Sequence, residues 1–532
     1  MNAVPVDLSD LRNRSAREAA LARVTDDGVG VTGLVSYSSA GRLLIVGHDA
    51  EPVARLALAA APLRPAVLLL AAGAGAVAGL TTWRAERASV DLTGWLGDFR
   101  LRLNAQGAAE ERFDLVLDLC DPPLTRAELP PPGYQAPGSE TSAQDAALET
   151  LRDLVGEFEK PRYFEYDPSI CAHGMKGTTA CRRCIDACPA EAITSLVDRI
   201  RVEPNLCQGG GVCASACPTG AITYVYPPVA DLLRRVRRLL AGYREAGGDN
   251  PVLLIHDTGE GAEPARALTE GAGQVLPLPV DEVASLGLEA WFSALAYGAR
   301  SVRLLGTHRV PESARRELGE QLGFARALLA GLGYPERAVD WLGQGPHALD
   351  PVMPALAPAG FAAAGDKRQI FFAAVDHLYA EAPGAHPLAE LPAGAPFGTA
   401  AVDAKACTLC LACVTVCPGK ALLDGHDLPQ LRFIEANCVQ CGLCTRSCPE
   451  DAIWISPRLL FDAQARGRPR VLREDSPFHC VSCGKPFATT AVIGRMQLRL
   501  AGHSMYQDPK ARRRLLMCGD CRVADQMLAQ EL

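Results

Sequence analysis

The sequence predicts a multidomain chain of the α/β and α+β classes, in which two α/β domains alternate with two cysteine-rich modules and a four-cysteine tail follows. Its 532 residues are too many for one hydrophobic core. Nineteen of its 20 cysteines fall into tight groups, and only Cys120 stands apart, as an expected buried thiol. Between these groups, apolar runs alternate with helical patterns, which is typical of parallel sheets covered by helices.

The first predicted domain, residues 1–135, has an α/β pattern. Leu43–Val46, Ala66–Leu70 and Phe113–Leu119 are apolar runs of strand length, and Glu51–Ala61 has the composition of a helix. The turn after the first strand is GHDAEP and lacks the G-x-G-x-x-G pattern, so no dinucleotide site is indicated. We therefore expect a small parallel sheet without a nucleotide.

One uncharged stretch, Pro65–Trp83, has two interpretations. Its length allows a membrane span. Its Gly- and Ala-rich second half favours a buried strand followed by a Gly-rich turn and a helix. We expect the second arrangement and no membrane association.

The bulk composition restricts location and partners. The N-terminal residues lack the apolar core of a signal peptide, and tight cysteine groups are typical of metal binding in a reducing compartment. We therefore expect a cytoplasmic protein. Its net charge of −8 gives no electrostatic support for binding nucleic acid.

A Pro- and Gly-rich linker, Pro130–Ser142, and a predicted helix, Ala146–Lys160, lead into the first cysteine module, residues 161–228. The second α/β domain follows at 229–395. It begins with Val229–Ala246, where apolar side chains recur on one helical face and arginines cover the other.

A βαβ unit is expected within this second domain. Val252–Ile255 and Val302–Leu305 have strand patterns, and Asp281–Gly298 has a helical one. His256, Asp257 and Glu260 follow the first strand, at the edge where open α/β sheets bind ligands. With one short motif, we favour a structural role for this sheet over a ligand site.

Four copies of one motif lie in the cysteine modules: a cysteine cluster that closes on Cys-Pro, with Ala three residues after the Pro and then Ile or Leu. The copies are Cys181–Ile193, Cys207–Ile222, Cys407–Leu422 and Cys438–Ile453. The last two match the C-x2-C-x2-C-x3-C-P spacing that holds [4Fe–4S] clusters. Three cysteines of each run ligate one cluster, and the fourth ligates the other. The chain is therefore expected to move single electrons.

The second module, residues 396–460, is expected to hold two [4Fe–4S] clusters. The Cys407 set consists of Cys407, Cys410, Cys413 and Cys448, and the Cys438 set of Cys438, Cys441, Cys444 and Cys417. Zinc, the structural alternative, would rarely use two interleaved cysteine runs that end in Cys-Pro.

The first module departs from the pattern twice. Thr178 stands where the cysteine before Cys181 should be, and Cys171 lies upstream across the loop 172–180. A longer loop could still deliver that thiol, so we expect a [4Fe–4S] cluster on the Cys171 set. This set consists of Cys171, Cys181, Cys184 and Cys217.

The second departure is Gly210, which replaces a cysteine. It leaves the Cys207 set with three members, namely Cys207, Cys213 and Cys188. Three thiolates fit a [3Fe–4S] cluster, or a [4Fe–4S] cluster with one other ligand; an empty, incomplete site is the alternative.

The predicted C-terminal domain, residues 473–532, carries two CxxC pairs on either side of a predicted helix, Ala491–Ala501. The tail set consists of Cys480, Cys483, Cys518 and Cys521. Two such pairs without Cys-Pro endings favour a closed structural zinc site. Mononuclear iron is the chemical alternative, and a fifth iron–sulfur cluster is less favoured.

The residues Tyr166–Tyr226 and Ala404–Pro457 resemble bacterial 2[4Fe–4S] ferredoxins, and the whole layout resembles the large polyferredoxins of bacteria. The layout is also similar to 4Fe-4S proteins found alongside molybdenum- or tungsten-dependent formate dehydrogenases. The resemblance implies cytoplasmic electron transfer with a larger oxidoreductase as redox partner.

We therefore expect an iron–sulfur electron carrier without a catalytic site of its own. No glycine-rich phosphate loop and no HExxH motif occur in the sequence. Two alternatives stay open: a subunit of an oxidoreductase whose α/β domain binds a flavin or nucleotide, and a redox sensor or assembly factor with labile clusters.

Overall fold

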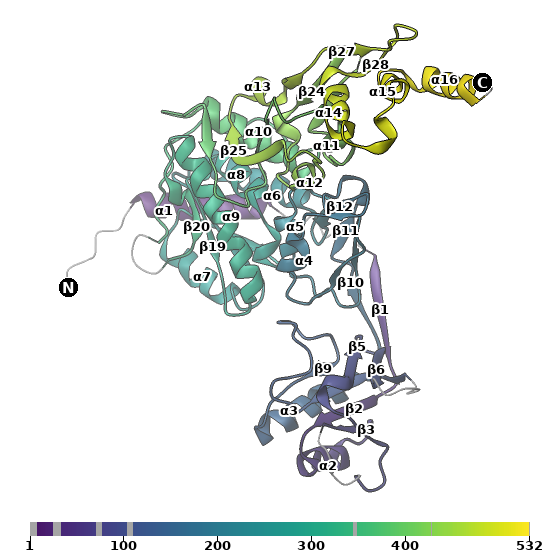
Figure 1. Ribbon diagram of the computed structural model, residues 1–532. Coiled ribbons are helices and arrows are strands. Elements are labelled where there is room, and N and C mark those ends of the chain that lie inside the picture. Colours follow the sequence, from purple (N-terminus) through teal and green to yellow (C-terminus); the bar gives the residue numbers. More distant parts are fainter. Residues whose placement is uncertain are drawn as a thin grey trace.

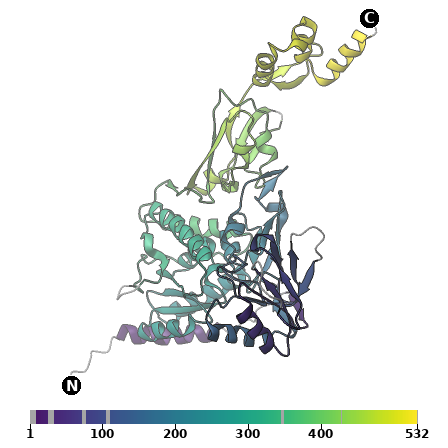
Figure 2. The ribbon, with the colours of Figure 1, turned by 60° about the horizontal axis from the view of Figure 1, so that its bottom comes forward.

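The computed structural model describes residues 8–24, 33–70, 77–103, 110–343, 348–426 and 428–530. The first α/β domain lies at one end of the molecule (Figure 1). Strands β1 (Leu34–Ser39) and β10 (Gly156–Pro161) connect it to the first cysteine module. The second module packs between the second α/β domain and the tail, which projects away from the body (Figure 2).

The first domain is built on a parallel sheet of order β4-β3-β2-β8-β9. Its elements are β2 (Arg42–Gly47), α2 (Ala50–Ala59), β3 (Arg64–Leu69), β4 (Thr82–Arg84), β8 (Leu115–Asp118), β9 (Tyr134–Gln135) and α3 (Thr141–Arg152). Leu43 and Ile45 of β2 pack with α2 and α3, whereas Leu44 and Val46 pack on the opposite face. The predicted strands, helix and parallel pairing are confirmed.

The uncharged stretch Pro65–Trp83 begins as the predicted buried strand, β3. The Gly-rich turn falls on residues 71–76, outside the described residues. The helix predicted beyond it is wrong for residues 82–84, which form β4 parallel to β3. Thr and Trp favour strands, and here they extend the sheet. Among the described residues, no helix has the length and apolar content needed to cross a membrane.

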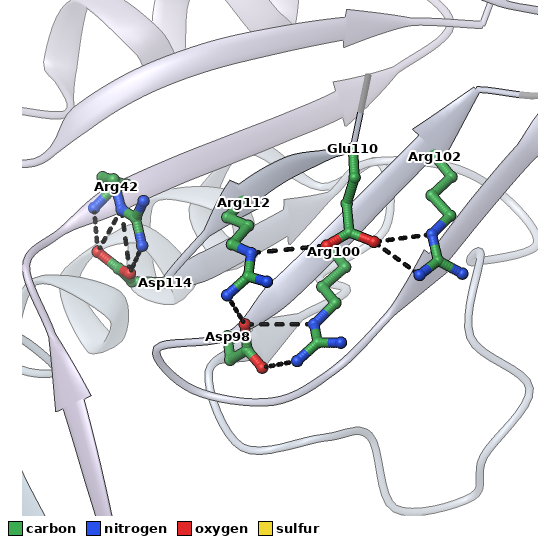
Figure 3. Close-up of polar contacts among 7 residues, drawn as sticks. All are labelled: Arg42, Asp98, Arg100, Arg102, Glu110, Arg112 and Asp114. Carbon is green, nitrogen blue, oxygen red and sulfur yellow. Dashed lines mark hydrogen bonds and ion pairs between the residues drawn. The ribbon is translucent and has the colours of Figure 1, made fainter. Parts of the chain in front are cut away.

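An antiparallel meander covers the second face of this sheet. Its strands are β5 (Val90–Thr93), β6 (Phe99–Leu103) and β7 (Glu111–Phe113). Figure 3 shows ion pairs along this meander: Arg100 Nη2 lies 2.6 Å from Asp98 Oδ2, and Arg102 Nη2 lies 2.6 Å from Glu110 Oε2. These side chains are partly exposed, so each pair adds little stability.

Helix α1 (Leu8–Arg23) packs far from the first sheet. Its Ala16 and Ala20 are buried against α6 (Val229–Glu245), in the core of the second α/β domain. The chain then reaches β1, which pairs antiparallel with β10. Residues 8–24 thus belong to the second core, although the sequence analysis placed them in a single domain over residues 1–135.

The predicted helix Ala146–Lys160 is wrong at both ends. Helix α3 starts at Thr141 and ends at Arg152, with Leu148 and Leu151 packed on the first sheet. Gly156 then takes a φ of +130°, which few other residues adopt, and strand β10 starts there. The helix therefore completes the first domain instead of leading into the first module.

The second α/β domain has a parallel sheet of order β18-β17-β19-β20. Its elements are β17 (Val252–Asp257), α7 (Ala262–Gly271), β18 (Val275–Val280), α8 (Leu288–Ala296), β19 (Ser301–Leu305), α9 (Glu312–Gly331), β20 (Val339–Trp341) and α10 (Lys367–Ala380). The predicted strands are confirmed. The helix predicted from Asp281 begins only at Leu288, because a 3₁₀ turn and Gly287 precede it. All residues of helix α8 are buried, including the polar Glu289 and Ser293.

Each cysteine module combines short antiparallel strands with one-turn helices. The first contains β11 (Phe164–Tyr166), β12 (Gly174–Met175), β13 (Thr178–Thr179), α4 (Arg183–Ala187), β14 (Ile193–Ser195), β15 (Ile200–Val202), α5 (Val212–Ala216) and β16 (Ile222–Tyr224). The second contains β21 (Leu388–Glu390), β22 (Gly398–Val402), α11 (Ala412–Thr415), β23 (Leu422–Gly425), β24 (Leu428–Phe433), α12 (Leu443–Arg446), β25 (Ile453–Leu460), α13 (Ala463–Gly467) and β26 (Arg470–Glu474). The tail contains β27 (Pro477–His479), β28 (Pro486–Thr489), α14 (Thr490–Leu500), α15 (Pro509–Leu515) and α16 (Gly519–Gln530).

The buried carboxylate of Asp114, the residue before β8, links β8 to β2 (Figure 3). Asp114 accepts a hydrogen bond from Arg42 Nη2 at 2.7 Å and from the backbone N–H groups of Ala40 and Arg42 at 3.0 and 2.9 Å. Burial alone would raise the pKa of Asp114, but these bonds outweigh it and hold the pKa below its usual value.

Asp114→Asn should lower the free energy of unfolding of this domain by about 2 kcal/mol at neutral pH, because a neutral amide leaves buried donors poorly satisfied. Urea unfolding followed by circular dichroism measures the change. Asp98→Asn, in the exposed meander pairs, is the matched control and should cost below about 0.5 kcal/mol. Equal losses of unfolding free energy in the two variants would contradict the stabilising role assigned to the buried Asp114 carboxylate.

Candidate iron–sulfur centres

A shared backbone turn precedes the Ala that follows each Cys-Pro at a fixed distance. In each copy the residue before that Ala has a φ between +48° and +77°: Glu191, Gly220, Lys420 and Asp451. In the second module the turn aims the Ala N–H at the Cys-Pro thiol. Ala421 N lies 3.2 Å from Cys417 Sγ, and Ala452 N lies 3.3 Å from Cys448 Sγ. Such donors stabilise a thiolate.

The CxxCxxC loops share a second feature: the middle position lies between two residues whose φ is between +54° and +82°. The flanking residues are Leu409 and Leu411 around Cys410, Gln440 and Gly442 around Cys441, and Gly209 and Gly211 around Gly210. This conformation folds the backbone into a tight loop that suits an anionic cluster. Gly210 therefore occupies the backbone position of the missing cysteine.

The second module brings both of its predicted thiol sets together. The Cys407 set lines one pocket, and the Cys438 set lines another. Each pocket receives one thiol from the other loop, Cys448 or Cys417, as the interleaved spacing predicts. The side chain of Gln440 adds a donor, with Nε2 3.3 Å from Cys438 Sγ.

The first module brings the Cys171 set together around one pocket. The inserted loop folds into the hairpin β12–β13, which lets Cys171 reach the other three thiols. The buried ring of His173 fastens this loop, with Nδ1 2.6 Å from the Cys181 carbonyl oxygen and Nε2 2.7 Å from Ser195 Oγ.

The three thiols of the Cys207 set also lie together. Burial raises the pKa of Cys213, and the nearby thiols of Cys207 and Cys188 raise it further. Lys160, from β10, donates through Nζ to the Cys207 carbonyl oxygen at 2.6 Å. A Cβ atom placed on Gly210 would meet only Pro189 Cγ, at 3.9 Å, so this position has room for a cysteine.

The donor chemistry of these sets fits iron–sulfur clusters. Burial raises the pKa of Cys181 and Cys441 to about 11 and that of Cys413 to about 12, so free thiols stay neutral at pH 7. Iron is ligated by the thiolate form. Sets of four thiols that include such poorly ionised members therefore fit a group whose metal ions offset the cost of ionisation.

The four sets form a continuous series across both modules. At each step two thiols lie close enough that one raises the pKa of the other, in addition to burial. The neighbouring thiols are Cys213 and Cys184, Cys181 and Cys441, and Cys444 and Cys413. The middle step crosses between the modules, where Arg446 also donates to the Thr179 carbonyl oxygen. The order is Cys207 set, Cys171 set, Cys438 set, Cys407 set.

The tail set converges as well. Its four Sγ atoms all lie within 4.8 Å of one another, and the Cys518 N–H donates to Cys480 Sγ at 3.2 Å. Gly484 closes the turn after the first pair with a φ of +73°. The predicted helix between the pairs is confirmed as α14. Such a four-thiol group can hold a metal ion.

The polar residues after β17 are used within their own loop. Asp257 accepts hydrogen bonds from the N–H groups of Gly259 and Gly261 at 2.9 and 3.1 Å. Glu260 lies 3.1 Å from His308, and the His256 ring contacts the Asp257 carbonyl oxygen. These contacts favour the structural role expected from the sequence.

Sequence reasoning missed basic residues that reach the cysteine loops from other domains, namely Lys160, Lys367 and Arg368. Arg368 is half-buried, and this burial lowers its pKa to about 10, which leaves it charged at neutral pH. No motif marks these residues. The capping pattern of Asp366 and Gln369 could have predicted a helix start here, but not its neighbours.

Comparison with protein families agrees on both modules. A model of the 4Fe-4S dicluster domain matches residues 406–453, and a model of the 4Fe-4S binding domain matches residues 200–223. No curated protein matches the chain. The protein is therefore an iron–sulfur protein with two ferredoxin-type domains, and the second match includes the loop that has Gly210.

Gly210→Cys should complete the Cys207 set, because the backbone already has the loop conformation and the side chain has room. We expect a gain of about one iron per chain and loss of the [3Fe–4S] EPR signal of the oxidised protein. Iron analysis and EPR of anaerobically purified protein measure both.

Gly209→Cys is the matched control. Its φ is +82° and its Cβ would lie 3.0 Å from the Tyr163 ring, so its thiol should not complete the set. An oxidised wild-type protein with no [3Fe–4S] signal and no iron for this set would show that the site is empty.

Proposed function

We propose that this protein is a polyferredoxin-type electron carrier that relays single electrons to or from a partner oxidoreductase. [4Fe–4S] clusters would be held by the Cys171, Cys438 and Cys407 sets, and a [3Fe–4S] cluster by the Cys207 set. The observation that supports this most is the continuous series of thiol sets, which crosses from one module to the other between Cys181 and Cys441.

When bound, iron–sulfur clusters accept and release single electrons. The chain would supply ligands, exclude water and set reduction potentials. The N–H groups of Ala421 and Ala452 and the amide of Gln440 point at ligand sulfurs. Hydrogen bonds to sulfur are among the features that set cluster potentials.

The partner would carry out the chemistry. A molybdenum- or tungsten-dependent formate dehydrogenase is the first candidate, on the similarity of layout alone, and the shared compartment would be the cytoplasm. The second α/β domain would hold the modules in place, since its α10 contacts loops of both.

The tail set would hold one zinc ion. Two CxxC pairs give the closed tetrahedral thiolate set of structural zinc sites, which contribute folding energy and no redox chemistry.

Anaerobically purified protein should contain about 15 iron atoms per chain, from three four-iron clusters and one three-iron cluster. Dithionite should bleach its visible absorbance, and air should restore it. Formate should bleach it only after formate dehydrogenase is added. Stoichiometric flavin together with NAD(P)H oxidation by the isolated protein would instead assign it to the enzymes.

Cys483→Ser should remove the zinc and unfold the tail while the visible absorbance stays intact, because this set lies outside the cluster series. Zinc analysis and limited proteolysis test this. Cys120→Ser, which changes a buried thiol outside every set, is the control and should retain both metals. Iron with a rubredoxin-like red colour in the tail would contradict the assignment.

A further inference from the structure

The first turn of α10 lies at the junction between the two modules. Asp366 and Gln369 form a reciprocal capping box that fixes where this helix starts. Lys367 Nζ then donates to the carbonyl oxygens of Ala214 and Ser215 at 2.7 and 2.6 Å. Both carbonyls lie between two cysteines of the first module, so the helix start is tied to the cluster loops on that side.

The next residue, Arg368, contacts both modules with one guanidinium. On the first side, Nη1 lies 3.4 Å from the carbonyl oxygen of Pro218, the residue after Cys217. On the second side, Nη2 donates to the carbonyl oxygens of Ala436 at 2.8 Å and Cys438 at 3.1 Å. A short hydrogen-bonded connection thus runs from the backbone of one thiol set to that of the next.

The charge of Arg368 acts in an apolar environment. Its Cζ lies 5.2 Å from the Phe372 ring centre and 4.9 Å from that of Phe397. Its hydrogen bonds, among the described residues, go to backbone carbonyls. A positive charge that is half-buried between aromatic rings, without a directly bonded carboxylate, acts more strongly on neighbouring charges than an exposed one does.

We propose that Arg368 couples the two modules: its guanidinium holds the loops of Cys217 and Cys438 together, and its positive charge raises the reduction potentials of the clusters on the Cys171 and Cys438 sets. The proposal rests on the proposed function, since it assumes clusters at both sets. Arg368 is a positioning residue, because it touches backbone carbonyls and no ligand sulfur.

The direction of the effect follows from charge. Reduction adds one negative charge to a cluster, so a nearby guanidinium stabilises the reduced form. Removing this charge should lower the equilibrium constant for reduction of the adjacent clusters about tenfold, which is 59 mV for a one-electron couple.

Arg466 offers a matched control. It is buried, and its Cζ lies 4.3 Å from the Phe372 ring centre. Its hydrogen bonds go to the carbonyl oxygens of Leu460 and Phe461, away from the cysteine loops, and its charge is paired with Asp376 at 2.6 Å. Arg466→Gln therefore removes a similar side chain without removing the junction.

The test compares Arg368→Gln, Arg368→Lys and Arg466→Gln with wild type, in full-length protein, by EPR-monitored redox titration and iron analysis. We expect the lowered potentials only in Arg368→Gln, together with a weaker magnetic interaction between reduced clusters of the two modules. Arg368→Lys keeps the charge, so its equilibrium constant for cluster reduction should stay within about threefold of the wild-type value.

Unchanged potentials in an Arg368→Gln protein that carries its full iron would overturn the proposal. If the Arg368→Gln variant does not load iron, the Arg368→Lys variant provides the test. Wild-type reduction potentials in Arg368→Lys would support the role of the charge, and a tenfold lower equilibrium constant for cluster reduction would overturn the proposal. Failure of the proposed function looks different, because the wild-type protein itself would then lack iron at these sets.

Discussion

The cost of burying ionised thiols is the constraint on which the rest of this structure depends. Four sulfurs around one small cavity repel each other as thiolates, and burial raises the pKa of Cys413 to about 12. Metal ions would remove this penalty, and the backbone reduces it with N–H groups aimed at sulfur. Ala421 and Ala452 meet this need, since the positive φ of the residue before each of them turns its N–H toward the preceding thiol.

The second α/β domain gains its importance from position. Helix α8 packs against its sheet, and α10 packs on α8. The first turn of α10 contacts both modules. Helix α1 joins the same core from the start of the chain. Through α10 the domain thus contacts two small cysteine modules, each of which has a modest apolar core of its own.

The sequence predicts the elements whose cause is local. The Cys407 and Cys438 sets follow from spacing alone, and the central strands β2, β3, β8, β17 and β19 follow from their apolar runs. What it does not predict depends on long-range packing. Helix α1 finds its partner α6 across more than 200 residues, β10 forms because β1 pairs with it, and Arg368 has no signature before folding brings Pro218 and Cys438 to it.

Anomalous diffraction at the iron absorption edge, from crystals of anaerobically purified full-length protein, tests the account most directly. We expect four separate iron peaks, one at each of the Cys207, Cys171, Cys438 and Cys407 sets. They should follow in that spatial order, with the middle two on either side of Arg368. Iron in the second module alone, or an interruption of the series between Cys181 and Cys441, would contradict the account.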